Sequence, residues 1–460
     1  MGKSVKRGGK RVEKAFDDFG AVVGHDDDDK LVVHSATVSD ADLTDCSLLV
    51  LRNLYVAHVA KLLLIAPTVD GTDVGEAWVA FQWASRLAVR HDVTLLTYAK
   101  RGAPRASEQL SGLSVVEWTE PPLLGRYERL NSMLKPGYVA FFARARAWIR
   151  QAQRAGEVFD VAHQALPVAM RYPTPLLGSG VPYVIGPVGG SLPTPPGFLA
   201  DADTAPWFSR LRGLDQWRLH HDPLLRRTFS EAACVLGIAP YVREHLAGIS
   251  LHRFEVLSET ALEQLPPLVS RSGRTGPVRL LFVGRLIRTK GVRDLVRALL
   301  HLPDCDVTLD IVGDGYEREP LTALVEGQGL SERVRLHGRL RRAEIDGLYR
   351  SADVFVFPSF REAGGNVVLE AMSFGLPLVV ADVGGPGSAT DDSCALRLRP
   401  SDPETYAADI AQAIRRLASD EPMRLLMGER ARERAERTAL WSHRVDAVSE
   451  IYEEVVQARR

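Results

Sequence analysis

Residues 354–387 read VFVFPSFREAGGNVVLEAMSFGLPLVVADVGGPG, and this stretch decides the fold class. An apolar run precedes a loop with one acid and two glycines, and a helical pattern with a second acid follows. Another apolar run and a further glycine turn complete the segment. Apolar strands that alternate with helices predict a parallel sheet with helices on both faces. Ligands bind such sheets at the carboxyl ends of the strands, so the segment predicts a ligand site.

The two acids of this segment are Glu362 and Glu370, and seven residues separate them. Gly364 and Gly365 lie between them, at the predicted start of the helix. The free N–H groups of a helix N-terminus attract phosphate, and glycine lets phosphate approach closely. A carboxylate within the helix can accept hydrogen bonds from ribose hydroxyls, while one in the preceding loop can reach a sugar beyond the phosphates. The spacing therefore fits a nucleotide diphosphate sugar.

The pattern E-x7-E in REAGGNVVLEAM, with AMSFGLPLVVADVGG after it, resembles the retaining glycosyltransferases of family 4, also called glycosyl transferases group 1. The segment LLFVGRLIRTKGVRDLVRAL (280–299) resembles the phosphate-binding segment of that family. Three further pieces follow in the family's order: IVGDGYERE (311–319), RVRLHGRL (333–340) and LYRSADVFVFPS (348–359). The resemblance covers residues 61–456. It implies an α/β chain with the GT-B fold, in which two Rossmann-like doubly wound domains face across a cleft and a C-terminal helix crosses back to the first domain.

The resemblance also implies a donor site. Arg285 and Lys290 lie around a strand-to-helix turn, where two cations can neutralise a departing diphosphate. We expect Glu370 to bind ribose hydroxyls, and Glu362 either to bind hydroxyls of the donor sugar or to shield an oxocarbenium charge. A solvated surface position is the alternative for each of these charged residues. The predicted donor-binding residues are Gly75, Gly284, Arg285, Lys290, Gly338, Glu362, Ala363, Gly364, Gly365, Asn366 and Glu370.

A histidine completes the predicted catalytic set. His163, in FDVAHQALP (159–167), ends a predicted strand, as does a histidine in family members with DVVH-type motifs. It is a candidate for contact with donor or acceptor hydroxyls, and a structural role at the strand end is an equal alternative. The predicted catalytic residues are Glu362, His163, Arg285 and Lys290.

Two loops and one departure from the family pattern bear on the site. PTVDGTDVGEAW (67–78) is expected to bring Gly71 and Gly75 near the diphosphate or the sugar, and GPVGG (186–190) to form a wall of the cleft. Many family members carry a Glu shortly after the glycine pair that here begins GGPGSATDD (384–392). Ser388 stands at that position, so a ligand contact is missing or Asp391 replaces it.

The resemblance implies a retaining hexosyltransferase that moves a sugar from a UDP- or GDP-sugar to a hydroxyl of a glycan, lipid-linked or small-molecule acceptor. Cations and helix N-termini supply the electrostatic stabilisation that this reaction needs. We therefore expect no cofactor and no metal. Carboxylate pairs occur as Asp201-Ala-Asp203 and Asp304-Cys-Asp306, but neither follows a strand at the diphosphate site. The alternatives are a non-catalytic GT-B protein that binds a nucleotide sugar and an enzyme that epimerises or hydrolyses one.

Composition agrees with this interpretation. The chain has 460 residues, 45% of them hydrophobic, which predicts two or three domains. Its formal net charge of −1 gives no general reason to expect nucleic acid as a partner. The four cysteines lack metal-site spacing and indicate free thiols in a reducing cytoplasm. We predict a cytoplasmic enzyme of polysaccharide or glycoconjugate biosynthesis, with no membrane span and no secretory signal.

The predicted domains follow the βα rhythm. Residues 1–60 are an N-terminal extension, in which HDDDDK (25–30) matches a protease recognition sequence often added for expression or is a native acidic run. Strands are expected at LLLIAP, DVTLLTYA, LSVVEW, FDVAH, VPYVIGP and CVLGIA (234–239), the last taken as the final strand of the first half. The remaining boundaries are an acceptor domain at 61–264, a linker and hinge at 265–277, a nucleotide-sugar domain at 278–438 and a returning helix at 439–460.

The segment 125–154 contains a basic amphipathic helix. Phe141, Phe142, Ala145, Trp148 and Ile149 alternate with Arg144, Arg146, Arg150 and Arg154. Such a helix can lie on an anionic membrane surface where a lipid-linked acceptor waits, so peripheral contact at the inner membrane face through 138–154 is one interpretation. Packing of its apolar face on the first sheet is the favoured one.

Overall fold

The computed structural model describes residues 22–25, 31–35, 59–73, 75–99, 102–120, 137–190, 192–200 and 213–459. Residues 1–58 form one compact unit and residues 59–460 another. In the first unit, β1 (Val22–His25) pairs antiparallel with β2 (Leu31–Ser35). Residues 26–30 of the HDDDDK run lie outside the described residues.

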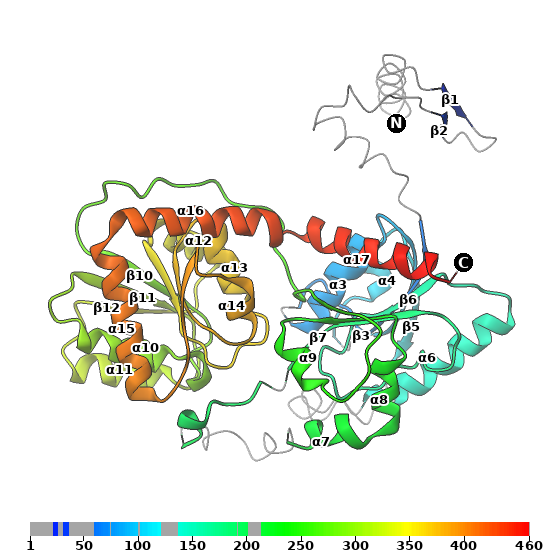
Figure 1. Cartoon of the computed structure of the whole chain (residues 1–460), viewed down its shortest axis with the longest axis horizontal. Coiled ribbons are helices and arrows are strands. Elements are labelled where there is room, and N and C mark those ends of the chain that lie inside the picture. The colour runs from blue at the N-terminus through cyan, green and yellow to red at the C-terminus, as the bar shows by residue number, and fades with distance from the viewer. Residues whose placement is uncertain are drawn as a thin grey trace. The chain divides into compact units, whose positions relative to one another are not determined.

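Seven parallel strands form the first sheet of the second unit, in the order β5-β4-β3-β6-β7-β8-β9 (Figure 1). The strands are β3 (Lys61–Thr68), β4 (Asp92–Ala99), β5 (Ser114–Thr119), β6 (Val161–Gln164), β7 (Tyr183–Val188), β8 (Cys234–Gly237) and β9 (Phe254–Val256). The described helices of this half are α3 (Glu76–Leu87), α4 (Ala106–Gln109), α6 (Gly137–Arg154), the 3-10 turn η2 (Pro196–Phe198), α7 (Gly213–His221), α8 (Pro223–Ser230) and α9 (Tyr241–His245).

One strand prediction was wrong. CVLGIA is β8, but the final strand of this half is β9, which pairs with β8 at the sheet edge. Only three residues form β9, and none of them is buried. A strand so short has no buried apolar run, so periodicity could not find it.

The central strand β3 explains why helices cover both faces of this sheet. Six of its eight residues are buried. Leu62 and Leu64 belong to one apolar core, whereas Leu63 and Ile65 belong to a second one. Successive side chains of a strand point to opposite faces, so an uninterrupted apolar run needs a core on each side.

Six parallel strands form the second sheet, in the order β12-β11-β10-β13-β14-β15. They are β10 (Val278–Val283), β11 (Val307–Val312), β12 (Val334–Gly338), β13 (Val354–Phe357), β14 (Leu378–Ala381) and β15 (Ala395–Leu398). The helical elements of this half are η5 (Arg288–Lys290), α10 (Val292–Ala298), η6 (Leu299–His301), α11 (Arg318–Gly327), α12 (Arg342–Ser351), α13 (Asn366–Ser373), α14 (Gly384–Ala389), α15 (Pro403–Ser419) and α16 (Glu421–Thr438). Two doubly wound α/β sheets confirm the predicted fold class, while the domain boundaries stay predictions.

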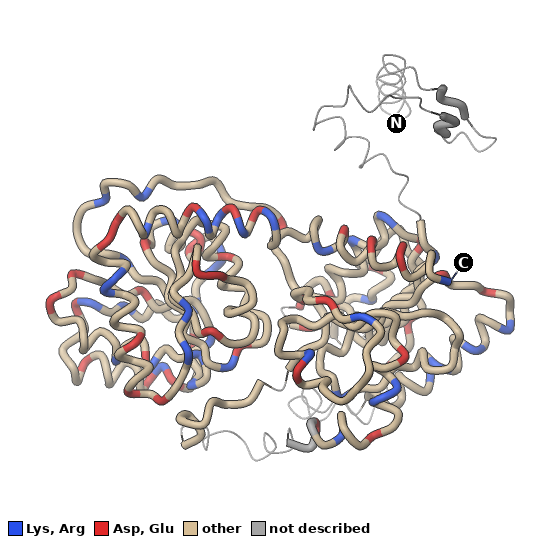
Figure 2. Tube along the Cα trace, viewed as in Figure 1, with Lys and Arg blue, Asp and Glu red and all other residues tan. Residues whose placement is uncertain are grey.

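The last helix, α17 (Trp441–Gln457), returns to the first sheet, as predicted. Its buried side chains Trp441, Val448 and Tyr452 belong to an apolar core of the first sheet. The indole rings of Trp441 and Trp83 meet edge to face, with 5.3 Å between their centroids. In Figure 1, α16 and α17 follow one another from the second sheet to the first. Acidic and basic residues alternate along α16 (Figure 2), which agrees with the balanced net charge.

The linker is fixed to the second sheet at its distal end. The Arg271 guanidinium donates to the carbonyl oxygens of Tyr349, Ala352 and Phe374. Arg274 donates to the carbonyl oxygens of Arg350 and Ser351. The last carbonyls of a helix have no intrahelical partner, so these two arginines cap α12. The loose composition of 265–277 thus indicates a loop, but from Arg271 onward this loop is attached to the second domain.

The basic amphipathic helix is α6, and its apolar face is used inside the protein. Phe141, Ala145 and Ile149 are buried in the second core of the first sheet, and Phe142 and Trp148 pack against the same core. The buried side chains Phe141, Ala145 and Ile149 are therefore not available to a bilayer, and Phe142 and Trp148 are available only in part. In the described part of the chain, no helix combines the length and the apolar character that a membrane span requires.

Candidate functional site

Both sheets have a crevice where the strand order reverses, and in the second sheet this point lies between β10 and β13. The segment with Arg285 and Lys290 follows β10, and the loop with Glu362 follows β13. The topology therefore brings the two predicted donor-binding segments to one edge of one sheet. Ligands of doubly wound sheets bind at this kind of position.

Three glycines lie side by side at the ends of β10, β11 and β12. The N–H of Gly313 donates to the carbonyl of Gly338 at 2.8 Å, and a Cβ on Gly313 would lie 1.8 Å from the carbonyl oxygen of Gly284. Gly313 also has a φ of +137°. No other residue fits this position. The predicted donor-binding residues Gly284 and Gly338 thus belong to a closely packed backbone edge.

Lys290 and Glu362 form an ion pair across this edge. Their side chains are 9% and 19% exposed, respectively. The Lys290 ammonium also lies 5.7 Å from the centroid of the Phe357 ring. Gly291 fixes the approach of the two loops, because a Cβ there would lie 2.1 Å from the carbonyl oxygen of Pro358. One predicted cation and one predicted acid are therefore in direct contact.

Arg285 differs from Lys290 in its surroundings. Its side chain is exposed, and it makes no ion pair with any residue in the described ranges. A guanidinium in this position can turn towards an anion without giving up a protein partner. The predicted pair of cations thus consists of one paired lysine and one arginine that has no ion-pair partner among the described residues.

A second arginine of the same segment was not predicted. Arg288 is 4% exposed and forms a bidentate ion pair with the buried Asp294, at 2.5 and 3.0 Å. Its guanidinium lies 5.3 Å from the ring centroids of Phe198 and of Phe360. Those two rings stack on each other with 4.3 Å between centroids.

Phe198 belongs to the first half of the sequence but to the core of the second sheet. It is fully buried, and Gly197 before it has no space for a side chain, because a Cβ would lie 2.2 Å from the carbonyl oxygen of Ser401. An aromatic residue in a proline-rich loop is a weak sequence signal. Only the tertiary structure shows that Phe198 packs behind Arg288 and Phe360.

The glycine loop after Glu362 leads into α13. Gly365 is the N-cap residue of that helix, with a φ of +84°. The next glycine turn supports the loop, since the N–H of Gly385 donates to the carbonyl of Glu362 and a Cβ on Gly385 would lie 1.9 Å from the carbonyl oxygen of Gly364. The predicted helix start at Gly364 and Gly365 is confirmed.

The same loop touches residues of the first half. Ala363 packs against the second core of the first sheet, and the side chain of Asn366 accepts a hydrogen bond from the Thr260 hydroxyl. The Glu259 carboxylate lies 3.1 Å from the ideal Cβ position of Gly364. Glu259 and Thr260 were not predicted, since they follow the short strand β9 and no motif marks them.

Glu370 lies on α13 with its carboxylate held at both oxygens. Arg342 donates to one oxygen at 2.6 Å, and the Tyr349 hydroxyl donates to the other at 3.2 Å. Burial and then the nearby Glu370 carboxylate raise the pKa of Tyr349, so this hydroxyl stays a donor. The Glu370 side chain is 17% exposed. A carboxylate can accept about four hydrogen bonds, so positions for a ligand remain.

His163 is separated from this site. It is fully buried in β6, and its two ring nitrogens hydrogen-bond to the Tyr452 hydroxyl and to the carbonyl of Gly186. Burial lowers the pKa of His163 to about 4. The side chain thus joins β6, β7 and α17, which argues against the predicted contact with substrate hydroxyls and favours the structural alternative.

The first-sheet loops after β3 and β7 are glycine-rich, and the first of them also carries the acids Asp70 and Asp73. Gly75 is the N-cap residue of α3, and no atom lies within 4 Å of its ideal Cβ position. The N–H of Gly190 donates to the Tyr241 hydroxyl at 3.0 Å. Leu192, just after that loop, lies 2.7 Å from the ideal Cβ position of Gly384. The chain just after GPVGG therefore meets the second domain close to Glu362.

Two further predictions concern Asp391 and the two Asp-x-Asp pairs. Asp391 accepts hydrogen bonds from Ser393 and from Arg434, so it is held away from the glycine loop by other partners. Asp304 and Asp306 precede β11 and so lie at the amino ends of the strands, opposite to the site. Residues 201–203 lie outside the described residues. Within the described ranges, no group of three His, Cys, Asp or Glu residues could hold a metal ion.

Comparisons with known proteins agree with this geometry. Residues 270–434 match the family model described as Glycosyl transferases group 1. The glycogen synthase of Mycobacterium tuberculosis is 27% identical over 392 residues, which cover 79% of this chain and 87% of that protein. The D-inositol 3-phosphate glycosyltransferase of Corynebacterium jeikeium is 32% identical over 240 residues, so that 50% of this chain aligns with 54% of that relative.

Solved structures extend the likeness to both sheets. HepE of Anabaena in complex with UDP has a TM-score of 0.59 at 18% identity, and the match covers 86% of this chain and 100% of HepE. At that identity the likeness shows the fold alone. The chain therefore has the GT-B fold, and residues 270–434 form a Glycosyl transferases group 1 domain, which makes glycosyltransferase its enzyme class.

Proposed function

We propose that this chain transfers a hexosyl group from a UDP- or GDP-sugar to a hydroxyl of a glycan, lipid-linked or small-molecule acceptor, with retention at the anomeric carbon and without a metal. The observation that supports it best is the contact between Lys290 and Glu362 at the β10 and β13 crevice. This contact lies beside the glycine N-cap of α13. Cation, acid and helix N-terminus together suit a diphosphate that carries a sugar.

Each group has a separate task in this proposal. Lys290 and Arg285 attract the diphosphate, and the first N–H groups of α13 donate to it. Glu362 then loses part of its pairing with Lys290 and accepts from donor-sugar hydroxyls. Glu370, oriented by Arg342 and Tyr349, accepts from the ribose. His163 has no task in this proposal, because its ring nitrogens are already bonded within the core.

The proposed reaction exchanges one bond of the anomeric carbon for another. The bond from this carbon to the diphosphate oxygen breaks, and the diphosphate takes the electron pair. The acceptor oxygen then bonds to the same carbon on the same face, and its proton passes to the departing phosphate or to a base. Lys290 and Arg285 stabilise the charge that develops on the leaving group. This electrostatic contribution is why we propose a reaction that needs no metal.

Relatives support the donor class. HepE has been solved with UDP bound, and the relatives from Mycobacterium and Corynebacterium carry the names of glycosyl-transferring enzymes. We also propose a cytoplasmic location, supported by the free thiols of Cys234, Cys305 and Cys394. Peripheral membrane contact through 138–154 receives no support from α6, because its apolar face packs in the core.

Turnover with a panel of UDP-, GDP- and ADP-sugars tests the proposal. We expect acceptor-dependent release of one nucleoside diphosphate, unchanged by EDTA, and loss of that release in Glu370→Ala. Glu326→Ala, on the exposed face of α11, is the matched control. NMR of the product anomer tests retention, and an anomer opposite to that of the donor would contradict it. Dependence of turnover on added metal would contradict the metal-independent mechanism.

A non-catalytic nucleotide-sugar-binding protein is the second candidate. The observation that favours it is the segment 384–392, in which Ser388 replaces the expected acid and Asp391 is bonded to Ser393 and Arg434. Neither Ser388 nor Asp391 therefore supplies the carboxylate that many members of the resembled family carry after this glycine pair. Tight donor binding without diphosphate release, under every acceptor offered, would favour this candidate over the transferase.

A further inference from the structure

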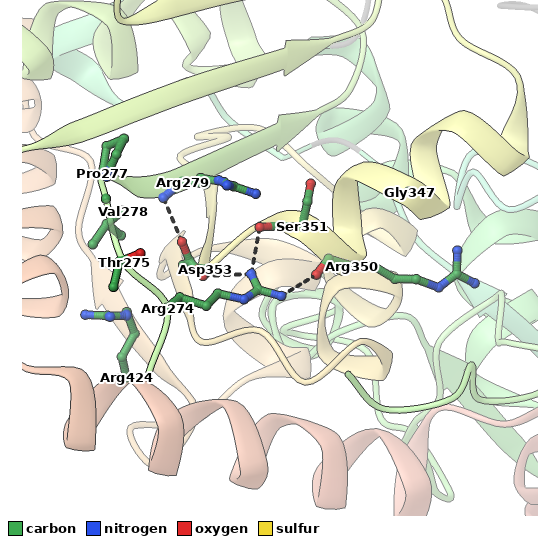
Figure 3. A pocket seen from close by; sticks show the side chains of 11 residues that line it. Arg274, Thr275, Pro277, Val278, Arg279, Gly347, Arg350, Ser351, Asp353 and Arg424 are labelled. Atoms are coloured by element: carbon green, nitrogen blue, oxygen red, sulfur yellow. Dashed lines mark hydrogen bonds and ion pairs between the residues drawn. The ribbon is translucent and has the colours of Figure 1, made fainter. Parts of the chain in front are cut away.

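A pocket lies at the end of the second sheet opposite to the candidate site (Figure 3). Its volume is about 400 Å³. The residues around it come from the end of the linker, the start of β10, the end of α12 and the start of α16. Because β10 and β13 leave this region and run towards Lys290 and Glu362, the pocket and the site are separated by the length of the sheet.

Four arginines and one aspartate give the pocket its charge: Arg274, Arg279, Arg350, Arg424 and Asp353. The single carboxylate is already in use. One oxygen of Asp353 accepts from the Arg274 side chain and the other from the backbone N–H of Arg279, both at 2.9 Å. Figure 3 shows Arg274 between Asp353 and the end of α12.

The other three arginines have no carboxylate partner in the described part of the chain. The Arg279 side chain is exposed and makes no hydrogen bond with a described residue. Arg424 donates to the carbonyl oxygens of Leu417 and Ala418, and the Arg350 guanidinium lies 5.5 Å from the Phe374 ring centroid. Carbonyls and rings do not neutralise these charges, so the pocket carries a net positive charge.

A fifth arginine increases the local charge. Arg271 lies behind the pocket wall, and burial together with the nearby Arg274 lowers its pKa to about 10. The Asp353 carboxylate acts in the opposite direction, but one carboxylate does not balance the arginines around it. No residue of the proposed donor site takes part in this cluster.

We propose that this pocket binds a small phosphorylated anion. Guanidinium groups present planar forks of N–H donors that match phosphate oxygens. Thr275 lines the same pocket and adds a neutral hydroxyl donor, whereas the Ser351 hydroxyl already donates to the carbonyl of Leu348. Its volume suits a phosphate group with a short organic substituent and is at the small end of ligand pockets generally.

Binding there would also hold the linker. Arg274, Thr275, Gly276 and Pro277 form one wall of the pocket, so an anion adds bonds between the linker and the second domain. The amide hydrogens of residues 274–279 then exchange more slowly with solvent. This readout is independent of catalysis, so the proposal can be tested even if the proposed donor is wrong.

Calorimetric titration of the full chain with inorganic pyrophosphate tests the proposal. We expect two binding events, because the donor site also attracts a diphosphate. Arg279→Gln should weaken one of them at least about tenfold, since it removes a charge-assisted hydrogen bond. Lys290→Gln should weaken only the other. Arg297→Gln, an exposed arginine on α10 that makes no ion pair with a described residue, is the matched control and should bind like wild type.

Further titrations in the Lys290→Gln protein identify the ligand chemistry. Tighter binding of glycerol 3-phosphate than of inorganic phosphate indicates a phosphate ester, and the reverse indicates free phosphate; either supports the proposal. The proposal is overturned if Arg279→Gln binds pyrophosphate like wild type, or if Lys290→Gln abolishes all pyrophosphate binding. It is also overturned if pyrophosphate leaves amide exchange of residues 274–279 unchanged in that protein.

Discussion

The two sheets share their central strand order, β4-β3-β6-β7 in the first and β11-β10-β13-β14 in the second, and therefore have equivalent crevices. Their chemistry differs. At the first crevice the predicted histidine, His163, is buried and fully hydrogen-bonded, and the helix that begins after Gly75 carries an acid, Glu76, in its first turn. At the second, Lys290 and Glu362 are paired and still partly exposed.

Strand topology thus produces a crevice in each sheet, but it does not determine whether a ligand binds there. Both crevices follow from right-handed crossovers and parallel strands. Among the described residues, the second crevice brings the predicted cation Lys290, the acid Glu362 and the glycine N-cap of α13 to one edge of the sheet. Function therefore depends on side chains at a site that the fold provides, and for that reason our proposal places the donor at the second crevice. The predictions below test whether the two crevices differ in this way.

The largest effect on stability is expected at a residue of the first half of the sequence that packs in the core of the second sheet. Phe198 precedes the second sheet by many residues in sequence but is buried in its core. Phe198→Ala should destabilise the second domain by about 3–5 kcal/mol, because it leaves a cavity behind Arg288 and Phe360. Urea unfolding followed by hydrogen exchange of β10 and β13 measures this loss. The neighbouring Leu199 is 56% exposed, and Leu199→Ala is the control. Equal stability of the two variants would contradict the assignment of Phe198 to that core.

The next effect concerns the charge at the second crevice. Lys290→Gln should lower turnover about 10²–10³-fold, the usual cost of removing one donor to a developing negative charge. Lys61→Gln, which removes an exposed lysine paired with Glu157 on the first sheet, is the control. Since Lys290→Gln leaves Glu362 without its partner, the double variant with Glu362→Gln separates lost stability from lost catalysis. Unchanged turnover in a folded Lys290→Gln protein would contradict the donor assignment.

The third prediction tests the structural role of His163 at the first crevice. Its pKa in the native state is about 4, against 6.5 for the ordinary side chain. Between pH 6.5 and pH 4, His163 is protonated in the unfolded chain but neutral in the native protein. The free energy of unfolding is therefore highest above pH 6.5 and falls as the pH drops towards 4. The loss is on the order of 3 kcal/mol. Chemical denaturation at several pH values measures it.

His163→Gln provides the comparison for that pH series. The variant lacks the titrating group, so its stability should change less than that of the wild type between pH 6.5 and 4. Turnover of the folded variant should remain close to that of the wild type. A large fall in kcat without any fall in stability would show instead that His163 takes part in the reaction.

The smallest effect is expected where the two halves meet. Thr260 donates to Asn366, the first residue of α13, and is 3% exposed. Thr260→Val should cost about 0.5–1.5 kcal/mol, the net contribution of one hydrogen bond. It should raise the KM for the donor more than it lowers kcat, since the bond positions α13. Thr322→Val, which removes a half-buried hydroxyl that donates to the carbonyl of Arg318 on α11, is the control, and identical behaviour of both variants would argue against a positioning role.

Sequence periodicity predicted most strands because their apolar runs are long and buried. LLLIAP and DVTLLTYA correspond to β3 and β4, and the bounds of β4 are the same as those predicted. It missed β9, whose three residues are not buried. The segment 265–277 was correctly taken as a loop, but its attachment to α12 depends on Arg271 and Arg274, and their targets lie more than seventy residues away.

The sequence by itself determined the alternation of strands and helices, the glycine turns and the identity of the charged residues after β10 and β13. Those properties are local: period, chain conformation and motif order are written along the chain. The tertiary structure decided which groups meet: Lys290 with Glu362, Glu259 with the glycine loop, Phe198 with Phe360, and His163 with Tyr452. Such contacts join residues far apart in sequence, and burial then fixes which of them remain available to a ligand.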